Sequence, residues 1–274
     1  MYKHLDLFSG IGGFSLGLEA TGEFETVAFC DYEPFCQKVL RKHWEEVPIY
    51  GDIKELTYEK LRADGIDQID IITGGYPCQP FSVAGNKKGE QDPRHLWPEY
   101  FRLVQECRPT WVIGENVGGH IKLGLDTVLK DLESEGYSTR TFSISAASIG
   151  ANHKRERVWI VAHSNDRLSN GKNEEVRTGR NTFNNGSSDL GNSENKRQQE
   201  QWNPESIPET FKRETERSST ERSSWWDVEP NVGRVVNGIP KRVDRLKSLG
   251  NSLIPQIPYY IGQSIIQSEK GEIK

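Results

Sequence analysis

The sequence lacks the features that mark several large classes of protein. None of its apolar runs reaches the length of a membrane span, and no secretory or transit signal precedes the first apolar run at residues 4–8. Its four cysteines, Cys30, Cys36, Cys78 and Cys107, show neither CxxC spacing nor a Cys/His metal pattern. We therefore expect a soluble, cytoplasmic protein with reduced thiols and with no membrane or metal partner.

The chain has no net positive charge and a low content of hydrophobic residues. The formal net charge is -5, which argues against a generally basic coat for nucleic acid but allows a local basic cleft. Only 34% of the 274 residues are hydrophobic and the mean hydropathy is -0.71, so part of the chain must be polar and thinly packed. The length suits one large domain, or a main domain with a smaller one inserted.

Short apolar runs alternate with amphipathic stretches over the first part of the chain. Strands are expected at residues 4–8, 25–31, 49–50, 69–73 and 110–115, and helices at residues 14–20, 35–43, 96–107 and 125–135. Two β-branched runs, residues 138–146 and 157–162, follow each other without a helix and predict an edge hairpin. This order predicts an α/β fold: a doubly wound, Rossmann-like sheet that is mostly parallel, with an antiparallel edge.

The composition changes after residue 163. Residues 164–224 are rich in Asn, Ser, Gly and charged side chains and have few apolar ones, so they predict a loop-rich insertion. We place this small module at residues 164–237 and the main domain at residues 1–163 and 238–274. A helix expected at residues 252–266 would pack back on the main sheet.

One cysteine stands in an unusual setting. Cys78 lies between Pro77 and Gln79, directly after a predicted strand that ends in two glycines. Proline on both sides of the Cys-Gln pair would hold the thiol rigidly beyond the sheet edge, where open α/β sheets bind ligands. A polar stretch at residues 83–94 has the length of a lid. Cys78 is thus a candidate nucleophile, the alternative being a buried, inert thiol.

Acidic residues and a glycine-rich turn follow the first three predicted strands. The turn at residues 9–13 lacks the full GxGxxG spacing, and such turns often serve packing alone. Asp31 and Tyr32 follow the second strand, where nucleotide-binding sheets hydrogen-bond ribose and where a ring can stack on adenine. Asp52 follows the third and suits an adenine amino group. Together they predict a nucleoside cofactor.

A carboxyl group and two arginines are expected near Cys78. Glu115 follows the strand at residues 110–115 and should lie at the same sheet edge. Arg155 and Arg157 would share one face if the chain there is extended, as binding of a phosphate or carbonyl oxygen requires. The alternative is an exposed edge strand.

Five blocks stand in order along the chain and carry a family resemblance. They are Asp-Leu-Phe-Ser-Gly-Ile-Gly-Gly from Asp6, Pro-Cys-Gln-Pro-Phe-Ser from Pro77, Glu-Asn-Val from Glu115, Lys-Arg-Glu-Arg-Val from Lys154 and Gly-Asn-Ser-Leu-Ile-Pro-Gln from Gly250. This set resembles the DNA (cytosine-5)-methyltransferase family over residues 1–163 and 238–267. His153 departs from it, because the family commonly has glutamine there.

The resemblance implies methyl transfer to carbon 5 of a cytosine flipped out of a specific duplex DNA sequence. Cys78 would add to carbon 6, and Glu115, protonated because burial raises its pKa, would bind ring nitrogen 3. Arg157 would donate to the exocyclic oxygen and Arg155 would lie near a phosphate. Residues 164–237 would recognise the target.

The resemblance also implies ligand contacts. For the cofactor S-adenosylmethionine, which leaves as S-adenosylhomocysteine, it assigns Phe8, Gly10, Ile11, Gly12, Gly13, Asp31, Tyr32, Asp52, Ile53, Pro77, Asn251 and Ser252. Candidate contacts to DNA are Ser82, Lys87, Lys88 and Arg94. No second subunit is needed, so a monomer is expected.

Three other functions compete with this interpretation. A catalytically silent DNA-binding homologue is disfavoured because all four catalytic-type groups are present. A transfer-RNA cytosine methyltransferase would use the same chemistry, although the composition of residues 164–237 suits duplex readout. A nicotinamide dehydrogenase is disfavoured because this chain lacks the full glycine fingerprint of that class. The target sequence, and membership of a restriction-modification system, a phage or neither, are left open.

Overall fold

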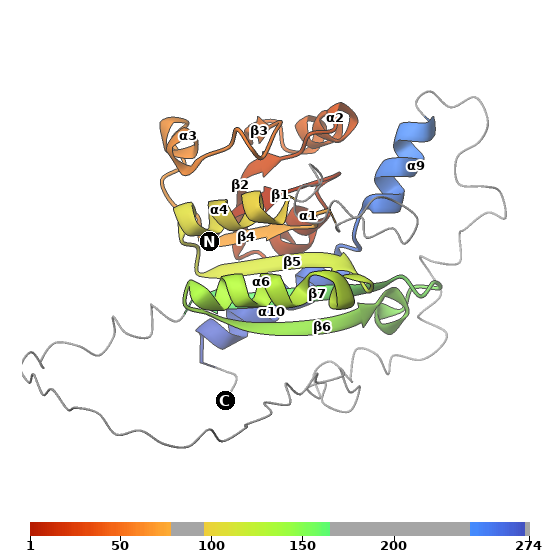
Figure 1. The fold of residues 1–274 in the computed structure, drawn as a ribbon. Coiled ribbons are helices and arrows are strands. Elements are labelled where there is room, and N and C mark those ends of the chain that lie inside the picture. Colours follow the sequence, from red (N-terminus) through yellow and green to blue (C-terminus); the bar gives the residue numbers. More distant parts are fainter. Residues whose placement is uncertain (78–95, 165–241, 272–274) are drawn as a thin grey trace, which may run out of the picture.

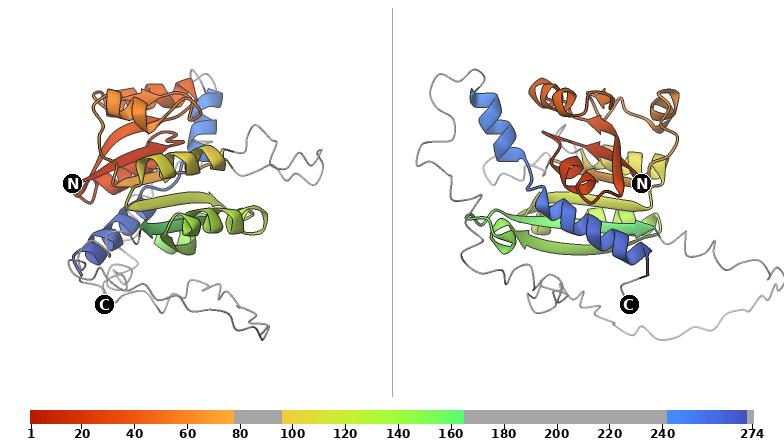
Figure 2. Two further views of the ribbon diagram at one scale, coloured as in Figure 1. Left: turned by 60° about the vertical axis from the view of Figure 1, so that its left-hand side comes forward. Right: turned by 180° about the vertical axis from the view of Figure 1, so that it is seen from behind.

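A seven-stranded sheet forms the centre of the protein in the computed structural model, which describes residues 1–77, 96–164 and 242–271 (Figures 1 and 2). The strands are β1 (Tyr2–Leu7), β2 (Phe24–Cys30), β3 (Ile49–Tyr50), β4 (Ile71–Gly74), β5 (Trp111–Val117), β6 (Tyr137–Ser145) and β7 (Glu156–Ser164). They lie in the order β3-β2-β1-β4-β5-β7-β6. β7 pairs antiparallel with both β5 and β6, and the other pairs are parallel, so the predicted, mostly parallel sheet with an edge hairpin is confirmed.

Helices connect the strands as the alternating pattern predicts. They are α1 (Gly13–Glu19), α2 (Pro34–His43), α3 (Tyr58–Ala63), α4 (Trp97–Cys107), α5 (His120–Leu123), α6 (Leu125–Ser134), α9 (Arg242–Asn251) and α10 (Gln256–Glu269), with a 3-10 turn at Ala146–Ile149. Sequence periodicity did not predict α3, α5 and α9. Helix α3 has six residues with only Leu61 buried, α5 has four residues, and Val243 and Leu249 of α9 are exposed. None of the described helices is long and apolar enough to cross a membrane.

Alternation along the strands divides the buried side chains between two faces. One face packs against α3, α4 and α6 and includes Leu5, Leu7 and Val112. The other packs against α1 and α10 and includes Ile71, Trp111 and Ile113. Figures 1 and 2 show these helices on opposite sides of the sheet. The result is a three-layer α/β/α domain, as expected of a doubly wound fold.

The C-terminal helix returns to the sheet beside α1, as predicted. The two helices approach so closely that a Cβ atom at Gly17 would lie 2.2 Å from the carbonyl oxygen of Pro255. A Cβ at Gly262 would lie 3.0 Å from Leu18. Glycine at these positions lets α10 lie against α1, and this contact brings residues 251–255 to the edge of the sheet that carries the candidate site.

Candidate active site

The predicted cofactor residues of the described chain lie at or beyond the carboxyl ends of the parallel strands. Phe8, Gly10, Ile11 and Gly12 lie between β1 and α1, and Gly13 begins α1. Asp31 and Tyr32 follow β2, Asp52 and Ile53 follow β3, Pro77 follows β4, Asn251 ends α9 and Ser252 follows it. Parallel neighbours end at the same edge, so segments far apart in sequence meet there. Cys78, Ser82, Lys87, Lys88, Arg94 and residues 165–237 of the proposed module lie outside the described residues.

The glycine turn is held against the end of β2. Phe8, Gly10 and Gly12 all have positive φ, at 52°, 56° and 84°, which costs glycine little but strains Phe8. The amide of Gly10 donates to Asp31 Oδ2 over 2.7 Å, and Asp31 Oδ1 accepts from the amide of Glu33 at 2.8 Å. The turn and Asp31 therefore form one unit at this edge.

Further groups around this unit suit a nucleoside. Tyr32 is 76% exposed, so a face of its ring is available for stacking. Asp52 Oδ1 accepts from the amide of Lys54 at 3.0 Å, which orients this carboxylate, whereas Ile53 is buried in the core. A Cβ at Gly13 would lie 3.0 Å from Leu253, which places the segment after α9 against the turn. The exposed ring and two carboxylates fit an adenosine-bearing cofactor.

Glu115 lies close to Arg157 on the next pair of strands. Its Oε1 atom is 3.0 Å from Arg157 Nε, and its side chain is 14% exposed. Burial raises the pKa of Glu115, although the charges of Arg157 and Arg155 oppose the shift. The shift is in the direction of the protonated carboxyl group, the form that catalysis through a carboxylic acid requires.

The segment that leads to Cys78 is fixed to β5 and to the residues that follow it. Asn116 Nδ2 donates to the carbonyl of Tyr76 at 3.0 Å, and the Tyr76 hydroxyl lies 2.8 Å from His120 Nε2. A Cβ at Gly75 would lie 3.0 Å from Glu115 Oε2. No role of Tyr76, Asn116 or His120 was predicted from the sequence. Asn116 could have been noticed because it stands inside the Glu-Asn-Val block, but nothing local identifies His120.

Arg155 and Arg157 have different partners in the structure. Arg155 precedes β7 with φ of 28°, so strand alternation does not describe it. Its Nη2 atom donates to the carbonyls of Gly250 at 2.8 Å and Ser252 at 2.6 Å. Arg155 thus ties the start of β7 to the segment after α9, whereas Arg157 holds Glu115.

A buried polar network lies under the glycine turn, on the α1 face. Asp6 accepts from Ser15 Oγ at 2.9 Å and from Thr73 Oγ1 at 3.4 Å. His4 Nε2 lies 2.7 Å from the same Thr73 hydroxyl. Burial raises the pKa of Asp6 to about 7 and lowers the pKa of His4 to about 3. Both groups are therefore mostly neutral in the folded protein between about pH 3 and about pH 7.

These two shifts have opposite effects on stability. The raised pKa of Asp6 contributes stability below its unfolded value near 3.8, and this contribution is lost as pH rises towards 7. The lowered pKa of His4 contributes stability above its unfolded value of 6.5, and this contribution is lost as pH falls towards 3. Between pH 4 and pH 6.5 the two slopes therefore offset each other.

Asp6→Asn should remove the contribution of Asp6 and leave that of His4 unopposed. Asparagine keeps an acceptor for Ser15. Relative to the wild type, the free energy of unfolding should therefore fall by about 1.4 kcal/mol per pH unit between pH 6.5 and pH 4. Urea unfolding of both proteins across this range measures the difference, in which other titrating groups cancel. Parallel curves for the two proteins would contradict this prediction.

Comparisons with known proteins agree with this arrangement. Residues 2–257 match the family described as C-5 cytosine-specific DNA methylase. The type II methyltransferase M.HgiBI of Herpetosiphon aurantiacus is 36% identical over 166 residues, 58% of this chain and 37% of that protein. The type II methyltransferase M1.ScrFI of Lactococcus lactis is 36% identical over 174 residues, 62% of this chain and 43% of that protein. The chain thus spans less than half the length of these curated relatives.

A solved structure supports the fold. A mutant of DNMT2 from Spodoptera frugiperda superposes with a TM-score of 0.53 and 23% identity, covering 61% of this chain and 51% of that chain. At this identity the likeness concerns the architecture alone. The match to the family, in contrast, covers nearly the whole chain, from the first strand to the start of α10. The chain therefore belongs to the C-5 cytosine-specific DNA methylase family.

Proposed function

We propose that this chain transfers a methyl group from S-adenosylmethionine to carbon 5 of a cytosine flipped out of a specific duplex DNA sequence, through a covalent Cys78 adduct at carbon 6. The pairing of Glu115 with Arg157 carries this proposal. Their 3.0 Å contact lies at the sheet edge where the segment leading to Cys78 begins. A largely buried carboxyl group with a raised pKa is what protonation of a cytosine ring requires. Family membership supports the same reaction.

The proposed reaction proceeds in successive steps. The Cys78 thiolate forms a bond to carbon 6, and Glu115 gives its proton to ring nitrogen 3, which neutralises the charge that develops there. Arg157 donates to the exocyclic oxygen and orients Glu115. Carbon 5 then becomes nucleophilic and accepts the methyl group. Water removes the proton from carbon 5, the bond from carbon 6 to sulfur breaks, and nitrogen 3 returns its proton to Glu115.

S-adenosylmethionine supplies the methyl group and leaves as S-adenosylhomocysteine. Asp31 would accept from the ribose hydroxyls, because each of its oxygens accepts one hydrogen bond from the backbone of the described residues and has a second lone pair. Tyr32 would stack on adenine and Asp52 would accept from its amino group. The glycine turn, Pro77, Asn251 and Ser252 would complete the pocket, with Arg155 holding the segment that includes Ser252.

The remaining assignments concern DNA. We propose that residues 164–237 read the target sequence, that residues 1–163 and 238–274 form the catalytic domain, and that Ser82, Lys87, Lys88 and Arg94 contact the phosphates. Because one chain would carry both parts, it would act as a monomer in the cytoplasm of a bacterium, encoded there or by a phage. The curated relatives include proteins of bacteria and of a virus.

Purified protein should transfer labelled methyl from S-adenosylmethionine to genomic DNA of a methylation-deficient bacterium. Nucleoside analysis should place the label on 5-methyldeoxycytidine, and sequencing of the methylated sites should yield one short recognition sequence. Transfer to transfer RNA but not to DNA would contradict the duplex assignment. Binding of both cofactor and DNA without any transfer would instead support a silent homologue.

A further inference from the structure

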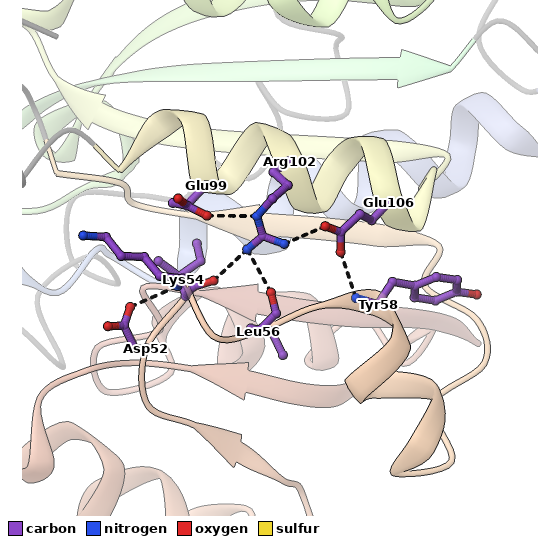
Figure 3. Close-up of polar contacts among 8 residues, drawn as sticks. Asp52, Lys54, Leu56, Tyr58, Glu99, Arg102 and Glu106 are labelled. Atoms are coloured by element: carbon purple, nitrogen blue, oxygen red, sulfur yellow. Dashed lines mark hydrogen bonds and ion pairs between the residues drawn. The ribbon is translucent and has the colours of Figure 1, made fainter. Parts of the chain in front are cut away.

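One arginine of α4 grips the turn that carries Asp52. Arg102 Nη2 donates to the carbonyls of Ile53 and Leu56, each at 2.9 Å. The rest of its guanidinium pairs with two glutamates of the same helix: Nε donates to Glu99 Oε2 at 2.9 Å and Nη1 to Glu106 Oε1 at 2.7 Å. Figure 3 shows Arg102 between the two glutamates, directed towards the turn.

Glu106 extends this grip to the start of α3. Its second oxygen, Oε2, accepts from the amide of Tyr58 at 2.9 Å. Tyr58 is the first residue of α3, whose first amides have no partner within the helix. Residues 52–58 are therefore held by α4 at three backbone atoms, the carbonyls of Ile53 and Leu56 and the amide of Tyr58, all through one ion-paired cluster (Figure 3).

The elements on either side of the turn are short, and the buried side chains of Ile53 and Leu56 also hold it. The strand before it, β3, has two residues, and α3 after it has six. Within the turn, short backbone bonds join Glu55 to Asp52 and Leu56 to Ile53, and Asp52 Oδ1 accepts from Lys54. The direction of the Asp52 carboxylate therefore depends on a turn that Arg102 anchors to α4.

We propose that Arg102, supported by Glu99 and Glu106, is a positioning residue for the cofactor: it holds the turn of Asp52 in the geometry that receives the adenine end of S-adenosylmethionine. This inference rests on the proposed function only through the cofactor. A planar guanidinium serves four acceptors at once, which a lysine ammonium cannot do in the same geometry. Without Arg102 the turn must be ordered each time cofactor binds, and affinity falls by that cost.

Two substitutions and a matched control test the proposal. Arg102→Gln removes both the charge and the planar guanidinium group with its several donors, and Arg102→Lys keeps the charge alone. Arg108→Gln is the control, because Arg108 follows the same helix but pairs with Glu135, 2.7 Å away, and its side chain is 56% exposed. Each protein is titrated calorimetrically with S-adenosylhomocysteine, well below its unfolding midpoint. Hydrogen exchange is followed at the amides of Lys54, Leu56 and Tyr58.

We expect Arg102→Gln to weaken S-adenosylhomocysteine binding by about tenfold, the effect of losing about one charge-assisted hydrogen bond. Arg102→Lys should weaken it by a smaller factor, and Arg108→Gln should bind as the wild type does. The three amides should exchange about tenfold faster in Arg102→Gln, faster by a smaller factor in Arg102→Lys, and at the wild-type rate in Arg108→Gln. The KM for S-adenosylmethionine should rise in the same proportion while kcat at saturating cofactor stays within about twofold.

The possible failures are distinguishable. Equal cofactor affinity in wild type and Arg102→Gln would overturn the positioning role, as would weaker binding without faster exchange at the three amides. If Arg102→Gln does not fold, unchanged affinity in Arg102→Lys would overturn it equally. A wild type that binds no S-adenosylhomocysteine would instead overturn the cofactor assignment itself. Hydrogen exchange at the three amides would then still show whether Arg102 orders the turn.

Discussion

Glu115→Gln should lower kcat by about 10²–10³-fold, because glutamine cannot give a proton to ring nitrogen 3 as charge develops on the cytosine. Burial raises the pKa of Glu115 against the opposing charge of Arg157 3.0 Å away. The wild-type rate should therefore decline as pH rises through the pKa of Glu115, because the proton is then lost. The variant should lack that decline. Single-turnover methylation of duplex DNA across the pH range measures both effects.

A matched change elsewhere separates chemistry from folding. Glu133→Gln replaces an exposed glutamate near the end of α6 that accepts from Thr139 at 3.1 Å, and should leave kcat and S-adenosylhomocysteine affinity unchanged. Glu115→Gln should retain the same cofactor affinity. A Glu115→Gln enzyme with normal kcat and an unaltered pH profile would exclude Glu115 as the acid.

Cys78→Ser should abolish turnover, with a loss of at least about 10⁴-fold, because a serine hydroxyl is not ionised near neutral pH and is a far weaker nucleophile than a thiolate. The three cysteines of the described residues are poor alternatives. All are free and buried, and burial raises the pKa of Cys30 and of Cys107 to about 12. Burial also raises the pKa of Cys36, so none of the three supplies a thiolate near neutral pH.

Cys107→Ser is the control for this experiment. Cys107 ends α4, at the opposite end of that helix from the segment that follows Cys78, and its replacement should preserve turnover. Cys78→Ser should still bind S-adenosylhomocysteine with wild-type affinity, because the predicted adenosine contacts lie on other strands. Turnover within tenfold of the wild type in Cys78→Ser would remove Cys78 as the nucleophile.

The fold was largely predictable because its strands and helices are long enough to carry a periodic pattern. Parallel strands bring their carboxyl ends to one edge, so the position of Asp31 beside the glycine turn followed from the strand order alone. The turn at Asp52 and the carboxyl group of Glu115 followed for the same reason. Motif order in the sequence was therefore sufficient to place Asp31, Asp52 and Glu115 at one sheet edge.

Contacts between an element and a distant loop were not predictable. Arg155 bonds to the carbonyls of Gly250 and Ser252, about 95 residues further along the chain, and the positive φ before β7 removes the alternation on which a shared face with Arg157 was argued. In the sequence, Arg102 stands three residues after Glu99 and four before Glu106, a spacing typical of ion pairs on a helix surface. Only the packing of α4 against residues 53–58 reveals its other role.

Trapping of the covalent intermediate tests the central claim most directly. In duplex DNA whose target cytosine carries fluorine at carbon 5, no proton can be removed from that carbon after methylation, so the bond from Cys78 to carbon 6 cannot break. With S-adenosylmethionine, wild-type protein should form a complex that survives denaturation, and peptide mass spectrometry should place the nucleotide on Cys78. Cys78→Ser should form none. Methylation at carbon 5 without such a complex, or a complex through another residue, would contradict the account.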